Sequence, residues 1–290
     1  MDVVDGERVV AEAAESYRAA LGDRLLAAYA LGSLAHGGFS ELVSDIDLGL
    51  IVRDPLEPGD GETIQATADA EKRKGSPLHE RLSVFWGTPA TLRGERDGGR
   101  FPALDRLDLI ENGRLLAGSD EARLGLPTPS ARELLVTGAE FALDYLAGIR
   151  RPGDLPGEGL GSMRRASEDA IEEIRSPDAL FSRGVRRVTK LVLFPVRFLY
   201  TVATGRVGTN DAAVARYLED DQAPSTTLVA AARKWRTAPP ADPSVASALL
   251  REELLPLYLY YIDDHIARLD SIGETDLVAA FREWRDRLIR

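Results

Sequence analysis

The first 129 residues combine a helical pattern with several strand patterns. Apolar residues at helical spacing predict a helix over residues 5–22. The apolar run Leu25–Leu31 predicts a buried strand that ends in the turn Gly32-Ser33, and residues 45–53 predict a second strand. Side chains alternate between the two faces of a strand. One face of the second strand carries Ile46, Leu48, Leu50 and Val52, and the other carries Asp45, Asp47, Gly49 and Ile51.

Further strand patterns occur up to residue 129, whereas only helical patterns follow Ser130. The first part is expected to add helices over 62–74 and 102–112 and strands over 81–88 and 114–117. The second part is expected to hold helices over 131–149, 162–174, 179–204, 210–218, 226–235, 245–268 and 275–290. A Gly- and Pro-rich segment, 151–161, predicts a loop. We therefore predict an α+β protein, with a small mixed-sheet domain of residues 1–129 followed by an all-α helical bundle domain of residues 130–290.

Charge and residue usage narrow the chemistry. The chain has 36 basic and 47 acidic residues, a formal net charge of −11, which argues against nucleic acid as a partner. It has no cysteine, so disulfides and thiolate metal sites are excluded. Its three histidines, His36, His79 and His265, lie far apart in the sequence. A bound divalent metal would therefore be held by carboxylates, which favours magnesium or manganese.

Membrane and secretory segments are not indicated. The acidic first residues lack the apolar core of a signal peptide. The longest apolar stretch, Leu191–Thr204, is too short to span a bilayer and contains Pro195 and Arg197. We expect a cytoplasmic protein with no membrane partner.

One segment, residues 32–52, carries the strongest chemical signal. Asp45 and Asp47 point to the same face of their strand, about 6–7 Å apart. Two such carboxylates repel each other unless cations neutralise them, and a pair of Mg²⁺ ions is one solution. Upstream, Gly32 and Ser33 follow a strand and open a short helix, where backbone amides and a hydroxyl bind phosphate oxygens.

This ordered set resembles the signature of the polymerase-beta-like nucleotidyltransferase superfamily. The matching residues are Gly32-Ser33 after one strand and Ser44-Asp45-x-Asp47 at the start of the next. Two further segments, GRLLAGSD (113–120) and FLYTVATGRVGTNDAAVARYLE (198–219), look like the aminoglycoside adenylyltransferases. Those enzymes join a minimal nucleotidyltransferase domain to a helical C-terminal domain.

The resemblance implies a metal-dependent transfer of a nucleoside monophosphate, AMP from ATP, to a hydroxyl of a small molecule. The acceptor would be aminoglycoside-like or of an unknown class. Asp45 and Asp47 would hold two Mg²⁺ ions. Gly32 and Ser33 would contact the triphosphate of ATP, and Ser44 would reach a phosphate oxygen.

The sequence departs from that family at three positions. The family's third carboxylate, on the next strand, is replaced by Ser83, and the nearest carboxylate is Glu80, just before that strand. Glu80 differs from Ser83 in strand parity, so it is a candidate base only from the entering loop. Asn210 stands where the adenylyltransferases have a phosphate-binding lysine, and Arg186-Arg187 replaces a drug-contacting carboxylate. Two alternatives therefore remain, a catalytically impaired nucleotide-binding module and nucleotidyl transfer to a macromolecule.

Overall fold

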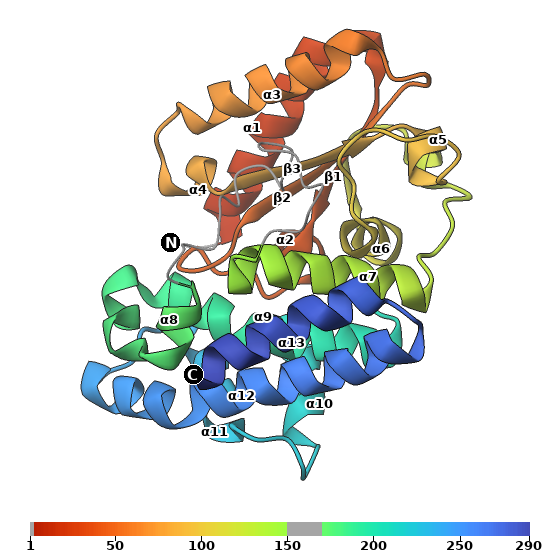
Figure 1. Cartoon of the computed structure of the whole chain (residues 1–290). Coiled ribbons are helices and arrows are strands. Elements are labelled where there is room, and N and C mark those ends of the chain that lie inside the picture. The colour runs from red at the N-terminus through yellow and green to blue at the C-terminus, as the bar shows by residue number, and fades with distance from the viewer. Residues whose placement is uncertain (1–2, 150–169) are drawn as a thin grey trace. The chain divides into compact units, whose positions relative to one another are not determined.

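The computed structural model describes residues 3–149 and 170–290. These residues form two compact units, the first ending at Pro129 and the second beginning at Ser130 (Figure 1). The predicted loop 151–161 and the first part of the helix predicted over 162–174 lie outside the described residues.

The first unit is built on a four-stranded sheet with the order β3-β2-β1-β4. The strands are β1 (Leu25–Leu31), β2 (Ile46–Val52), β3 (Leu82–Gly87) and β4 (Arg114–Gly118). Strand β1 is antiparallel to both β2 and β4, whereas β2 and β3 are parallel. The predicted mixed sheet is confirmed.

The helices of this unit are α1 (Val3–Leu21), α2 (Gly32–His36), α3 (Pro58–Lys72), α4 (Pro77–Glu80), α5 (Pro89–Leu92) and α6 (Ala103–Glu111). Short 3₁₀ turns cover Gly22–Arg24 and Asp120–Arg123. Helix α3 begins at Pro58, earlier than the predicted start at residue 62. Proline is favoured in the first turn of a helix, and the carboxylate of Asp60 accepts the N–H of Glu57 at 2.8 Å.

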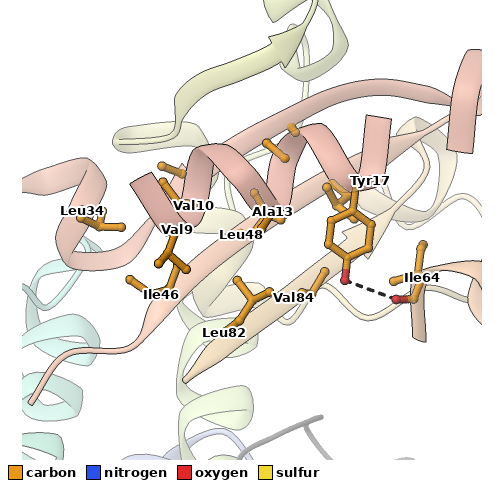
Figure 2. Packing of buried hydrophobic residues seen from close by; sticks show 14 of the residues in the cluster. Val9, Val10, Ala13, Tyr17, Leu34, Ile46, Leu48, Ile64, Leu82 and Val84 are labelled. Atoms are coloured by element: carbon orange, nitrogen blue, oxygen red, sulfur yellow. Dashed lines mark hydrogen bonds between the residues drawn. The ribbon is translucent and has the colours of Figure 1, made fainter. Parts of the chain in front are cut away.

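Helices α1 and α3 cover one face of the sheet with apolar side chains (Figure 2). The hydroxyl of Tyr17 on α1 donates to the carbonyl of Ile64 on α3 at 3.3 Å. The cluster includes Val9, Val10, Ala13, Tyr17, Ile46, Leu48, Leu50, Val52, Ile64, Leu82 and Val84. Even-numbered residues of β2 therefore face α1 and α3, so Asp47 lies on the opposite face of the sheet.

The opposite face packs against α5 and α6. Its buried cluster consists of Ala27, Tyr29, Leu31, Ile51, Phe85, Leu92, Leu109 and Leu126. Phe101, just before α6, lies against Gly49 of β2, where an added Cβ atom would be 3.1 Å from the Phe101 ring. On this face of β2, the charged Asp47 is therefore followed by Gly49 and the apolar Ile51.

The second unit is helical throughout its described residues. Its helices are α7 (Ala131–Ala142), α8 (Ala170–Arg175), α9 (Val185–Thr204), α10 (Asn210–Leu218), α11 (Thr226–Trp235), α12 (Pro243–Ser271) and α13 (Thr275–Ile289). A π-helical turn, Leu143–Ala147, follows α7, and a 3₁₀ turn, Pro177–Arg183, precedes α9. The predicted all-α second part is confirmed for these residues.

Two predicted helices in this unit are broken in the structure. The helix predicted over 179–204 begins only at Val185, because Gly184 has a φ of 89°, a backbone conformation that favours glycine. The helix predicted over 131–149 ends as α7 at Ala142 and continues as the π-helical turn.

Aromatic side chains dominate the packing of α12 and α13. Tyr258, Tyr261, Phe281 and Trp284 are completely buried, and the Tyr258 hydroxyl donates to the carbonyl of Leu191 on α9 at 2.9 Å. No described helix is long and apolar enough to cross a membrane.

Candidate active site

Asp47 lies at the centre of the candidate site, near the start of β2. It is paired in register with Leu31 at the end of β1 and with Ser83 on β3. Paired residues of neighbouring strands point to the same face of a sheet, so Ser83 shares the face of Asp47. The parallel register therefore brings Ser83 directly beside Asp47.

Gly32 lies against the carboxylate of Asp47. It opens α2 directly after β1 with a φ of 59°. A Cβ atom on Gly32 would overlap Oδ2 of Asp47, so only glycine leaves room for that carboxylate. The structure thus brings together two of the residues that the sequence singles out.

Asp108, which sequence reasoning missed, accepts a hydrogen bond from the backbone N–H of Gly32. Its Oδ2 accepts the Gly32 N–H at 2.5 Å, and its Oδ1 accepts the side-chain amide of Asn112 at 2.9 Å. Asp108 is buried on α6. In the sequence its only signal is a polar residue four positions before Asn112 in a predicted helix. A phosphate that used the Gly32 amide would have to displace Asp108.

We expect Asp108→Asn to lower the free energy of unfolding by about 1–2 kcal/mol, because hydrogen bonds to charged groups contribute about 1.5–3 kcal/mol. The asparagine oxygen can replace only one of the two acceptor atoms. Denaturant unfolding measures the change. Asp69→Asn, at an exposed carboxylate bound by Gln65, is the control, and equal losses in the two variants would contradict the role of Asp108.

Asp45 and Ser44 precede β2, and both lie near its start. The Ser44 hydroxyl accepts the N–H of Ser40 at 3.0 Å, and the Ser44 N–H donates to the Ser40 carbonyl at 2.8 Å. These bonds close the turn that leads into β2. Ser33 lies in the first turn of α2 and is partly exposed.

The described residues contain no cluster of three or more acidic or histidine side chains able to hold a metal. A Mg²⁺ ion needs fewer protein ligands, because it is commonly bound through one or two carboxylates together with phosphates and water. Asp47 fits that kind of site, since its side chain is partly exposed and Gly32, which has no Cβ atom, leaves room beside its carboxylate. Asp45, two residues earlier, is also partly exposed. They do not form an all-protein cage.

Glu80 ends α4 and is exposed, whereas Ser83 is 3% exposed. We expect Glu80→Gln to leave turnover within about twofold, because surface substitutions change free energies by roughly 0.5 kcal/mol or less. Steady-state rates with ATP and Mg²⁺ check this. A loss of two orders of magnitude would instead make Glu80 the general base.

Arg100 is a second residue that sequence reasoning missed. Its backbone N–H and carbonyl pair with Trp86 at 2.6 and 2.9 Å, along the edge strand β3. Its Nη1 donates to the carbonyl of Val84 at 2.6 Å, and its guanidinium lies 5.2 Å from the centre of the Phe85 ring. No local motif marks this arginine, which follows the glycine pair 98–99.

The structure places two of the residues at which the sequence departs from the adenylyltransferases. Arg187 donates through Nη2 and Nε to the buried Glu173, at 2.6 and 3.0 Å, which links α9 to α8. Asn210 is the first residue of α10, where the Thr209 hydroxyl accepts the N–H of Ala212 at 3.2 Å.

Comparisons with known proteins identify a solved structure with a similar fold. No protein-family model matches the chain, and no curated protein matches it in sequence. A solved structure, spectinomycin adenyltransferase AAD(9) from Enterococcus faecialis with ATP and spectinomycin, is similar over 99% of this chain and 98% of its own. The TM-score is 0.51 and the sequence identity is 12%. At this identity the likeness shows the fold, and it confirms the predicted architecture of the aminoglycoside adenylyltransferases.

Proposed function

We propose that the protein transfers a nucleoside monophosphate, AMP from ATP, to a hydroxyl group of a small molecule. The observation that carries the proposal is the contact of Asp47 with Gly32 at the ends of β2 and β1. It occurs in a chain with the fold of an adenyltransferase. That neighbour contains ATP and spectinomycin, which are therefore the first ligands to test.

The residues have separate tasks in this reaction. The acceptor hydroxyl attacks the α-phosphorus of ATP and its proton passes to solvent water. The bond from the α-phosphorus to the oxygen that bridges to the β-phosphorus breaks, and pyrophosphate departs with that oxygen. Asp45 and Asp47 would hold Mg²⁺, which when bound neutralises negative charge on the phosphates. The hydroxyls of Ser33 and Ser44 would donate to phosphate oxygens. Catalysis then consists mainly of positioning and electrostatic stabilisation.

Ser83 supports a second candidate, a nucleotide-binding module with impaired catalysis. It occupies the position beside Asp47 where the family has its third carboxylate. General-base assistance is worth about 10²–10⁴-fold in rate, so its loss slows transfer without preventing nucleotide binding.

Incubation with α-labelled ATP and Mg²⁺, across panels of aminoglycosides, spectinomycin and other hydroxyl compounds, separates the candidates. A labelled small molecule together with released pyrophosphate supports the proposed enzyme. Binding of ATP without product in any panel supports the impaired module. Label on protein or RNA would replace both with macromolecular transfer.

A further inference from the structure

The guanidinium of Arg100 has three nitrogens, and only one of them donates a hydrogen bond to a described residue. Nη1 donates to the carbonyl of Val84, whereas Nε and Nη2 are buried without a hydrogen-bond partner among the described residues. Buried polar groups are nearly always paired. Two unpaired nitrogens on one guanidinium therefore indicate a partner other than the described residues.

Other arginines of this chain show which partner fits the Nε and Nη2 atoms. In Arg24 these atoms donate to the two carboxylate oxygens of Asp60, and in Arg285 they donate to the two oxygens of Asp263. Together the two atoms form one planar edge of the guanidinium. This edge matches carboxylate and phosphate groups, which accept two parallel hydrogen bonds.

The unused edge of Arg100 belongs to the candidate active site. The guanidinium lies over Phe85, whose ring is in the cluster on the same sheet face as Asp47. Phe85 follows Ser83 by two positions on β3, and Ser83 is paired with Asp47. Arg100 therefore brings a cation to the sheet face that carries Asp47, close enough for the two charges to interact.

Two nearby carboxylates favour the charged form of Arg100. Burial lowers the pKa of Arg100, and the charges of Asp105 and Asp47 oppose that decrease. Neither carboxylate accepts a hydrogen bond from Nε or Nη2. Arginine remains protonated near neutral pH, so the side chain carries a positive charge on a buried edge whose two N–H groups are unpaired among the described residues.

We propose that the Nε–Nη2 edge of Arg100 binds a phosphate group of the nucleotide beside Asp47. This inference deepens the proposed function and rests on it, because it takes the nucleotide as the source of the phosphate. The small side chain at Ser83 agrees with it, since a carboxylate there would attract the guanidinium and compete with the phosphate.

Pyrophosphate binding in EDTA, without an acceptor, tests this edge separately from transfer. We expect calorimetry to detect binding to the wild type that weakens with added salt. Arg100→Gln should weaken that binding by about tenfold or more, and Arg100→Lys, which keeps the charge but not the planar edge, should also weaken it. Arg96→Gln, at an exposed arginine of the same segment, should bind within about twofold of the wild type.

A measurement on the wild type avoids any folding defect of the variants. The ¹⁵Nε signal of Arg100 should shift on addition of pyrophosphate or AMP, while that of Arg96 should not. A shift with AMP alone assigns the edge to the α-phosphate, and a shift with pyrophosphate assigns it to the leaving group. Either result supports the site.

Three results would overturn the proposal: no pyrophosphate or AMP binding by the wild type, equal affinity in Arg100→Gln, or a shift of the Arg100 signal with acetate only. If the metal-free binding depends on Arg100 but no labelled product forms with any acceptor, the proposed function fails while the phosphate site stands. If transfer occurs and Arg100→Gln keeps its phosphate affinity, only the Arg100 site fails.

Discussion

Asp47→Asn is expected to reduce Mg²⁺-dependent transfer of AMP by about 10³-fold, because one preorganised electrostatic contact is worth about 10²–10³-fold and this one also holds the metal. The amide keeps the size of the side chain but removes the charge that attracts Mg²⁺. The partly exposed position of Asp47 at the start of β2 allows the replacement without loss of core packing. Turnover of labelled ATP at saturating Mg²⁺ measures the effect.

Asp69→Asn is the matched control, since it makes the same chemical change at an exposed residue of α3. We expect it to keep wild-type turnover, and we expect both variants to keep thermal midpoints close to that of the wild type. Turnover above one tenth of the wild-type value in a folded Asp47→Asn protein would remove Asp47 from the metal site.

Strand periodicity alone was enough to predict which face of the sheet carries Asp47. The two-residue repeat of β2 predicted that Ile46 and Leu48 enter one core and that Asp47 faces the other side, as the structure shows. The position of Gly32 after the preceding strand followed from the same pattern. A period of two residues is a local property, so the sequence contains it directly.

Arg100 and Asp108 could not be found in this way. Arg100 comes from the segment after β3, which returns to pair with Trp86, and Asp108 comes from α6 and reaches Gly32 across 76 residues of sequence. Which loop or helix folds back over a strand is decided by tertiary packing, and no local pattern carries that information. Both residues bring charge to the site, so local analysis described Asp45 and Asp47 but missed a cation and a buried carboxylate.

The sequence mispredicted the start of two helices, at a proline and at a glycine. The helical pattern predicts a start at residue 62, yet Pro58 begins α3, because a proline in the first turn gives up no helical hydrogen bond. The apolar pattern predicts one helix over 179–204, yet the positive φ of Gly184 separates the 3₁₀ turn from α9. Neither Pro58 nor Gly184 is a residue of the candidate active site.

Gly32→Ala is expected to reduce turnover by about 10²-fold, because a displacement of about 1 Å at a reacting group can cost that much. The added methyl group would overlap Oδ2 of Asp47 and force the carboxylate or the start of α2 to move. It would also strain the backbone, since φ is 59° at this position. Transfer rates and thermal midpoints are measured together.

Gly22→Ala separates these two effects. Gly22 has a φ of 52°, close to that of Gly32, but a Cβ atom there meets nothing within 4 Å. Both variants should therefore lose about 1–2 kcal/mol of stability from the left-handed backbone, and only Gly32→Ala should lose activity. Combining Gly32→Ala with Asp47→Asn should cost little more than Asp47→Asn alone, because both changes act on one carboxylate. Fully additive losses would show that Gly32 acts on the triphosphate independently of Asp47.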